Sequence, residues 1–128
     1  MGLRSIDSPR RRPAPTTAHL VNAAGVKHTV GLEPRTLIVA VKSNCDGCLP
    51  FVEDPSLEFS DWRLMVVTRD NIPETAGQRT VWFAPELLDA LEITSAPFFV
   101  ALDGSPLNVV TEGVVFAPEQ VARELAES

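Results

Sequence analysis

The sequence predicts an α/β domain in which a mixed sheet carries helices on its faces. Apolar runs at 36–43, 63–68 and 98–102 lack alternation with polar residues, so they indicate strands that are covered on both sides. The tetrapeptide Phe-Ala-Pro-Glu occurs at 83–86 and again at 116–119. In both places, proline followed by glutamate is typical of the first turn of a helix. Strands and helices therefore alternate along much of the chain.

The remaining elements follow from turn and helix-start signals. Residues 19–22 and 27–30 flank a short turn, which predicts a hairpin with Gly25 at positive φ. The helix after the first strand should begin at Cys45 and end near Asp54, because the residue before a proline avoids the helical region. We also expect a loop or short helix at 69–79, a short strand at 80–83, a helix from Pro85 to near Ile93, a strand at 107–116 broken at Gly113, and a last helix from Pro118 with Val121 and Leu125 on one face.

Length and composition indicate one globular domain. The chain has 128 residues, of which 45% are hydrophobic, and we place the domain at 18–128. Residues 1–17 are expected to form a disordered basic tail or linker, since three arginines there are followed by Pro-Ala-Pro. Residues 1–12 carry a charge of +3, so the rest carries −9 and the whole chain −6. An acidic body without a basic patch argues against nucleic-acid binding.

No targeting or membrane segment is expected in the sequence as written. The basic start lacks the apolar stretch of a signal peptide, and no run approaches the roughly 20 apolar residues that a membrane helix needs. The sequence therefore predicts a cytoplasmic protein, and we expect it to act as a monomer. The alternative is the soluble domain of a membrane-anchored extracytoplasmic protein whose tether is missing from this chain.

Both cysteines lie in the motif Cys45-Asp46-Gly47-Cys48, directly after the first apolar strand. Thiols at this spacing can join in a disulfide and separate again, which predicts redox chemistry without a cofactor. The start of the following helix favours an anion, so the thiolate of Cys45 is expected to attack a partner disulfide and Cys48 to resolve the mixed disulfide. Gly47 lets a partner approach closely. The charge of Asp46 disfavours the thiolate and predicts a reductant or a mildly poised exchanger.

Other roles of the cysteine pair stay open at this point. A zinc site would need further ligands, and the only histidines, His19 and His28, both lie in the predicted hairpin. We therefore expect no metal. Alternatively, the two cysteines are buried and inert, or the motif is the relic of a redox site.

Residues 91–104 run from a predicted helix through Ser95-Ala96-Pro97 into a strand that ends at Asp-Gly. This arrangement resembles the segment around the cis-proline of the thioredoxin-like superfamily, in which a CxxC motif also follows an earlier strand. The resemblance covers about 18–127 and favours TlpA-like or methylamine-utilisation-type redoxins. It implies that Pro97 is cis and lies beside the cysteines, and that the backbone of Ala96 pairs with an extended protein substrate.

Some residues differ from the thioredoxin pattern. Asn44 stands where thioredoxins often have tryptophan, Asp-Gly replaces Gly-Pro between the cysteines, and Val39 stands in place of a buried aspartate. Pro50, in the second turn of the expected helix, should kink its axis. The residues that we expect to tune the site are Ser43, Asn44, Asp46 and Gly47.

The function predicted from these features is that of a thiol–disulfide oxidoreductase. It would act on protein substrates and exchange electrons with an upstream redox protein. One alternative is a redox-inactive binding module with the same fold. Another is a peroxiredoxin-like peroxide reductase, which usually has threonine three residues before its cysteine. Here Lys42 holds that position relative to Cys45, with Ser43 nearby.

Overall fold

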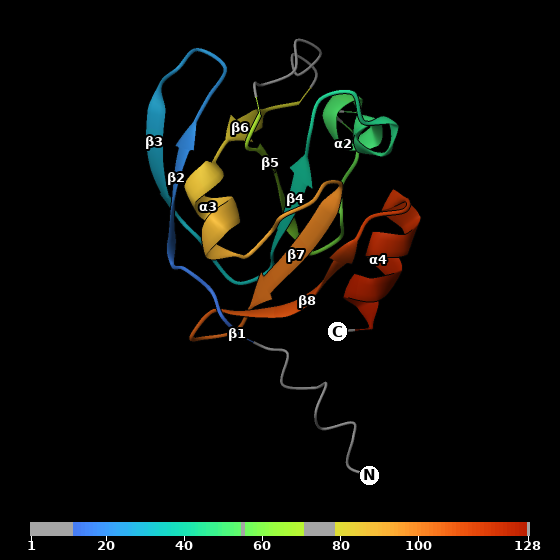
Figure 1. The fold of residues 1–128 in the computed structure, drawn as a ribbon. Helices are drawn as coiled ribbons and strands as arrows, with labels where there is room; N and C mark the ends of the chain where they lie inside the picture. The colour runs from blue at the N-terminus through green and yellow to red at the C-terminus, as the bar shows by residue number, and fades with distance from the viewer. Residues whose placement is uncertain (1–11, 55, 71–78, 128) are drawn as a thin grey trace.

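A mixed sheet forms the centre of the computed structural model, which describes residues 12–54, 56–70 and 79–127 (Figure 1). Within these residues the strand order is β1-β8-β7-β4-β5-β6-β2-β3. The pairs β4–β5 and β5–β6 are parallel and the other pairs are antiparallel. The strands are β1 (Arg12–Pro13), β2 (Thr17–Val21), β3 (Lys27–Gly31), β4 (Thr36–Val41), β5 (Arg63–Thr68), β6 (Val81–Phe83), β7 (Phe98–Asp103) and β8 (Asn108–Val114). The predicted mixed sheet is confirmed.

Short helices cover the sheet. They are the 3-10 helix η2 (Asp46–Cys48), α2 (Leu49–Glu53), α3 (Pro85–Ala90) and α4 (Pro118–Ala126). Figure 1 shows α3 against the half of the sheet that contains β2, with α2 and α4 beside β4 and β8. Both proline-led helix starts at Pro85 and Pro118 are therefore confirmed. No helix among the described residues is long and apolar enough to cross a membrane.

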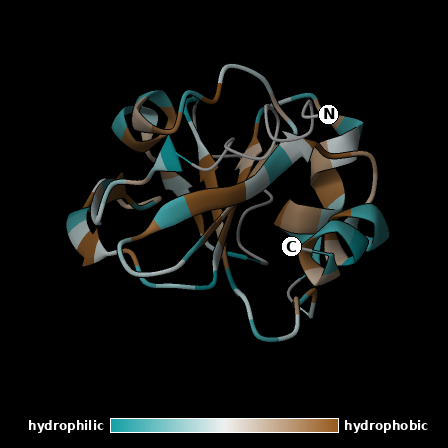
Figure 2. Ribbon diagram, turned by 90° about the horizontal axis from the view of Figure 1, so that it is seen from below, coloured by the Kyte–Doolittle hydropathy of each residue, from teal (hydrophilic) through white to brown (hydrophobic). Residues whose placement is uncertain are grey.

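The core lies on both faces of the sheet, and β4 contributes to both. All six of its residues are buried, as its unbroken apolar sequence predicts. Ile38 and Ala40 join the cluster that includes α3, whereas Leu37, Val39 and Val41 join the cluster that includes α2 and α4. Figure 2 shows hydrophobic residues, in brown, concentrated in the central strands.

The hairpin of β2 and β3 forms as predicted. His19 pairs with Thr29, and the chain turns back through Gly25 at a φ of 82°. The Asn22 side chain accepts hydrogen bonds from the N–H groups of Ala24 and Val26, both at 2.9 Å, and so fixes the turn.

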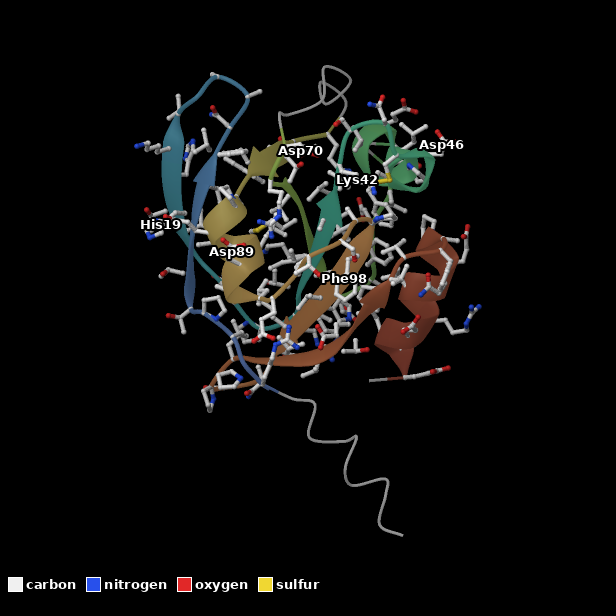
Figure 3. The ribbon with its side chains drawn as sticks, viewed as in Figure 1. His19, Lys42, Asp46, Asp70, Asp89 and Phe98 are labelled. Atoms are coloured by element: carbon white, nitrogen blue, oxygen red, sulfur yellow. A yellow bond between two sulfur atoms is a disulfide. The ribbon has the colours of Figure 1, made fainter. Side chains whose placement is uncertain are left out.

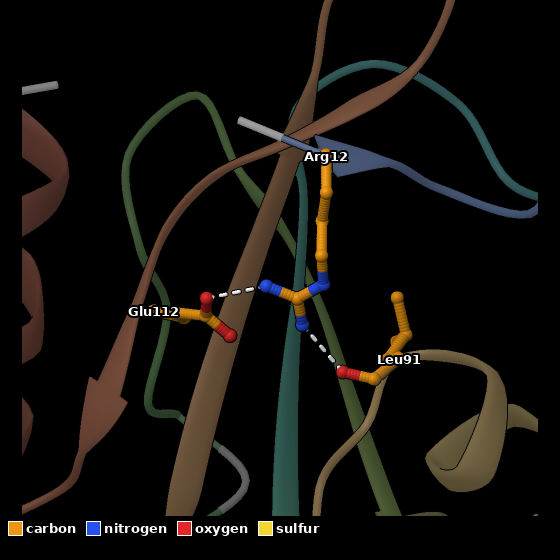
Figure 4. Close-up of polar contacts among 3 residues, drawn as sticks. All are labelled: Arg12, Leu91 and Glu112. Carbon is orange, nitrogen blue, oxygen red and sulfur yellow. Dashed lines mark hydrogen bonds and ion pairs between the residues drawn. The ribbon is translucent and has the colours of Figure 1, made fainter. Parts of the chain in front are cut away.

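The expected disordered segment at 1–17 is wrong for its last six residues. Arg12 and Pro13 form β1 on the edge of β8, and β2 begins at Thr17. The Arg12 guanidinium donates hydrogen bonds to the Glu112 carboxylate and to the Leu91 carbonyl (Figure 4). The bond to Glu112 raises the pKa of Arg12, although burial acts in the opposite direction. Residues 1–11 of the expected tail lie outside the described part.

Several predicted boundaries also need correction. The first strand ends at Val41 rather than 43, and α3 ends at Ala90 because Glu92 adopts a φ of 60°. Gly113 does not break β8: it pairs with Phe99, and the ladder is irregular between Ala101 and Leu102 instead. The predicted loop or short helix at 69–79 falls mainly on 71–78, outside the described residues.

Candidate functional site

Cys45 and Cys48 are joined in a disulfide at the end of the sheet where β4 ends, with Cα atoms 5.3 Å apart. Cys45 is extended, with φ −128° and ψ 106°, and directly precedes η2. Asn44 before it adopts a φ of 54°, a conformation that asparagine tolerates better than most residues. The Cys48 N–H donates a hydrogen bond to the Cys45 carbonyl at 3.1 Å, which closes the turn. The sequence motif therefore forms a disulfide where a strand leads into a helix.

The two sulfur-bearing residues differ in exposure. Cys48 is 1% exposed and belongs to the core cluster that contains Val39, Phe51 and Val115. Cys45 is only half-buried and borders that cluster. Because a thiol must be reached to react with a large partner, this difference favours Cys45 as the first to react.

The helix after the disulfide differs from the prediction in its first turn. It starts as the 3-10 turn η2 and continues as the five-residue α2. Pro50 therefore lies in the first turn of α2, where its missing N–H removes no helical hydrogen bond, and the predicted kink is wrong. Since only short helices follow Cys45, we expect their dipoles to stabilise a thiolate only modestly.

The end of α2 is stabilised by Asp54. Its carboxylate accepts hydrogen bonds from the Ser56 hydroxyl and N–H, and these bonds lower the pKa of Asp54. The charged form is thus favoured in the folded state. This contribution to stability is present above the unfolded pKa, about 3.9, and is lost as the pH falls through the lower folded value. Arg79 donates to the Asp54 carbonyl at 2.9 Å.

Pro97 lies directly against the disulfide loop. The Ala96–Pro97 peptide bond is cis, as the resemblance implies. A Cβ atom on Gly47 would lie 3.3 Å from Cγ of Pro97, so the backbone between the cysteines faces the proline ring. The Pro97 carbonyl accepts a hydrogen bond from Val115 at 3.0 Å, which ties this segment to the end of β8.

The backbone of Ala96 directly precedes cis Pro97 in the chain. Among the described residues, neither its N–H nor its C=O has a hydrogen-bond partner. The residue is half-buried and lies at the rim of a cavity of about 280 Å³. An extended segment could therefore form backbone hydrogen bonds here, as strands do when they add to a sheet.

The sequence did not point to this cavity or to Arg69, which helps to form it. The cavity lies between the ends of β4 and β5 and the segment before Pro97, with Lys42, Asp70 and Ser95 at its wall. Arg69 donates hydrogen bonds to Asp89 at 3.0 Å and to the Ile93 carbonyl at 2.7 Å, and so holds the segment that leads to Ala96. The one feature of the sequence that could have indicated this role of Arg69 is its position as a basic residue directly after β5.

The predicted tuning residues lie together in the loop that carries the disulfide. Ser43, Asn44, Asp46 and Gly47 are all exposed. Figure 3 shows Lys42 and Asp46 on either side of the yellow sulfur atoms. Among the described residues, no hydrogen bond engages the side chains of Ser43, Asn44 or Asp46.

Among the described residues, the buried polar or charged side chains are Thr36 and Thr68, so none of them is a carboxylate that could replace the aspartate at the position of Val39. Val39 is fully buried, and the cluster that it shares with Cys48 is aliphatic and aromatic. Glu53, the acidic residue beyond Cys48, is exposed to solvent. A thiol of Cys48 would thus lose its proton in an apolar environment, which disfavours the thiolate.

The histidines lie away from the disulfide, in the hairpin. His19 contacts the Thr29 hydroxyl at 3.1 Å, and His28 packs edge-on against Trp82 with ring centroids 5.2 Å apart. In the described residues, no group of three or more potential metal ligands is arranged to hold an ion.

Gly47 offers a direct test of the contact with Pro97. The variant Gly47→Ala is expected to lower the free energy of unfolding by about 1 kcal/mol, because its Cβ would press on a rigid proline ring. Urea denaturation of the oxidised protein measures this difference. Gly31→Ala is the matched control, since a Cβ there meets nothing within 4 Å. Equal stability of the two variants would show that Gly47 and Pro97 are not in close contact.

Comparison with protein-family models and with curated protein sequences gives no match. The fold is similar to that of an exposed lipoprotein thioredoxin from Streptococcus pneumoniae, with 16% identity, a TM-score of 0.61, and coverage of 88% of this chain and 99% of that one. A peroxiredoxin-like protein from Aquifex aeolicus has 15% identity and a TM-score of 0.58, with coverage of 90% of this chain and 84% of that one. A thio-disulfide isomerase from Thermus thermophilus has 16% identity and a TM-score of 0.56, with coverage of 90% of this chain and 92% of that one.

The fold is thus thioredoxin-like, and the predicted superfamily resemblance is confirmed at the level of fold. The site defined by this fold is a CxxC disulfide that lies against a cis-proline. The narrower resemblance to TlpA-like and methylamine-utilisation-type redoxins stays a prediction.

Proposed function

We propose that this protein is a thiol–disulfide oxidoreductase that acts on protein substrates. The observation that carries the proposal is the disulfide between half-buried Cys45 and buried Cys48, placed against cis Pro97. A buried and inert pair would leave neither cysteine exposed, whereas Cys45 is half-buried. The similar folds of a thioredoxin and a thio-disulfide isomerase support the same chemistry.

The reaction begins from the reduced dithiol. The Cys45 thiolate attacks one sulfur of a substrate disulfide, the substrate S–S bond breaks, and one substrate thiolate leaves and takes up a proton. Cys48 then loses its proton and attacks the Cys45 sulfur in the mixed disulfide. The second substrate thiolate leaves, and the Cys45–Cys48 disulfide forms. Two electrons have passed from the dithiol to the substrate, and an upstream redox protein restores the dithiol by the same exchange.

The substrate is held next to the reacting sulfur by backbone contacts. Ala96, which precedes cis Pro97, supplies an N–H and a C=O that have no hydrogen-bond partner among the described residues. Gly47 presents backbone without a side chain against Pro97, and the cavity at whose rim Ala96 lies accommodates a substrate side chain. Such pairing recognises an extended chain with little dependence on sequence.

The neighbours of the two sulfurs set the direction of electron flow. Asp46 places a negative charge beside Cys45, which disfavours the thiolate and therefore favours the disulfide. The apolar surroundings of Cys48 act in the same way. Ser43 and Asn44 complete the exposed loop that tunes the pair. A protein poised in this way passes electrons to its substrate, so it acts as a reductant or a mild exchanger. We also propose that it works as a monomer and without a cofactor.

A turnover assay tests the proposal. With dithiothreitol as electron donor, the wild-type protein should accelerate the reduction of insulin disulfides, and Cys45→Ser should not. A folded protein that binds but never accelerates the reaction would be a redox-inactive binding module. Peroxide consumption that depends on Cys45 in the absence of insulin reduction would assign it to the peroxide reductases.

A further inference from the structure

Exposed apolar side chains occur at the end of β8, in the turn that leads into α4, and in α2 directly after the disulfide. Val114 is 48% exposed, Phe116 is 81% exposed, and Leu49, directly after Cys48, is 41% exposed. Between the first two, Val115 is 5% exposed and points into the core cluster that contains Cys48. This alternation turns Val114 and Phe116 outward together.

The chain here is tied to the disulfide site. The Val115 N–H donates a hydrogen bond to the Pro97 carbonyl, and Val114 pairs in the sheet with Phe98, the residue after the proline. Gly47 meets the ring of the same proline. Val115 also shares its core cluster with Cys48 of η2 and Phe51 of α2, so the turn that leads into α4 and these two helices pack on the same part of the core. We call the outward-facing pair Val114 and Phe116 the Phe116 surface.

Gln120 holds the turn that presents Phe116. Its side-chain oxygen accepts hydrogen bonds from the N–H groups of Phe116 at 2.6 Å and Ala117 at 3.3 Å. Its amide nitrogen donates to the Val114 carbonyl at 3.0 Å. A fixed, exposed phenylalanine adds nothing to the core, whereas fixed aromatic side chains are effective anchors in protein interfaces because little entropy is lost when they bind.

The charge around the Phe116 surface is negative. The elements η2, α2 and α4 hold four carboxylates and one basic side chain, Arg123. Asp46, Glu53 and Glu119 are exposed. This charge repels anionic membrane surfaces and acidic segments, and it attracts lysine and arginine.

We propose that the Phe116 surface docks an extended segment of a protein partner, in which apolar residues and lysine or arginine flank the reacting cysteine. This inference rests on the proposed function and names the chemistry of its partner. The apolar residues of the segment cover Phe116 and Val114, while its basic residues face Asp46 and Glu119. The partner sulfur then lies over Cys45.

Peptides of defined sequence test the docking. Three nine-residue peptides carry a central cysteine as its mixed disulfide with thionitrobenzoate, flanked by leucine and lysine, by leucine and glutamate, or by glycine and serine. Cys45 of the reduced protein attacks the peptide sulfur, thionitrobenzoate leaves, and its absorbance gives the second-order rate constant. The proteins compared are the wild type, Phe116→Ser and the matched control Val26→Ser, which removes a 51% exposed apolar side chain from the distant hairpin.

The wild type should react fastest with the leucine–lysine peptide. Phe116→Ser should slow that reaction about tenfold, which is typical of the loss of an interface anchor, and should leave the glycine–serine peptide and free dithiobis(nitrobenzoate) unaffected. Val26→Ser should match the wild type with every probe.

Two results would overturn the docking alone: equal rates of Phe116→Ser and wild type with the leucine–lysine peptide, or a wild-type preference for the glutamate peptide. If the reduced wild type reacted with none of the probes, dithiobis(nitrobenzoate) included, the proposed function would fail as well. Unchanged reactivity of Phe116→Ser with dithiobis(nitrobenzoate) shows that the variant is folded and its thiols are intact.

Discussion

Replacing Cys45 by serine is expected to abolish the reduction of protein disulfides, lowering the rate at least about a thousandfold. A serine hydroxyl stays protonated at neutral pH and cannot take the place of a thiolate nucleophile. Replacing Cys48 should have a different consequence, because Cys45 can still attack but the mixed disulfide is no longer resolved. Cys48→Ser should therefore accumulate a covalent complex with its substrate. Insulin turnover and non-reducing electrophoresis measure the two outcomes.

Both variants should remain folded. The disulfide closes a very short loop, so its effect on the entropy of the unfolded chain is small. Circular dichroism before and after reduction of the wild type provides the control. If Cys45→Ser trapped the mixed disulfide and Cys48→Ser stayed unreactive, the order of the two cysteines would be the reverse of the one argued from their burial.

Phe51→Ala is expected to cost about 3–5 kcal/mol of the free energy of unfolding. Phe51 is fully buried in α2 and lies parallel to Phe59, with ring centroids 6.4 Å apart. It shares the core cluster of Cys48, so its loss leaves a cavity beneath the helix that carries the second sulfur. The whole free energy of unfolding of a small domain is about 5–15 kcal/mol, so the variant should unfold at a much lower urea concentration than the wild type.

Leu49→Ala is the matched control on the same helix. Leu49 is 41% exposed, so its truncation should shift the free energy of unfolding by only about 0.5 kcal/mol. The two variants are compared by urea denaturation of the oxidised proteins. A Phe51→Ala transition that coincided with that of Leu49→Ala would show that α2 does not pack on the core as described.

The features that the sequence predicted correctly depend on neighbours in the chain. The run that forms β4 is apolar at almost every position, and burial on both faces of a sheet is the arrangement that removes it from water. The cysteines are three residues apart, so the turn of η2 brings them together wherever the helix lies. Gly25 and Asn22 close their hairpin locally in the same way.

The features that it missed depend on residues far apart. The segment from Arg12 resembles a linker in composition, yet Glu112, a hundred positions away, gives Arg12 a partner and an ordered place on the sheet. Gly113 weakens a strand in isolation, but here its backbone pairs beside the Phe99 ring, which a Cβ would meet at 3.5 Å. The exposed position of Phe116 could not be predicted from its apolar neighbours, because it depends on the hydrogen bond that its N–H donates to Gln120 and on the one that Gln120 donates to the Val114 carbonyl.

The central claim is that the Cys45–Cys48 disulfide opens and closes reversibly in the folded protein. An equilibrium titration against mixtures of reduced and oxidised glutathione, with alkylation of free thiols under native conditions, tests it most directly. We predict that both thiols appear together in a single two-electron transition and that circular dichroism stays that of the folded protein throughout. A disulfide that stays closed at every ratio, and under excess dithiothreitol, until urea unfolds the chain would contradict the account.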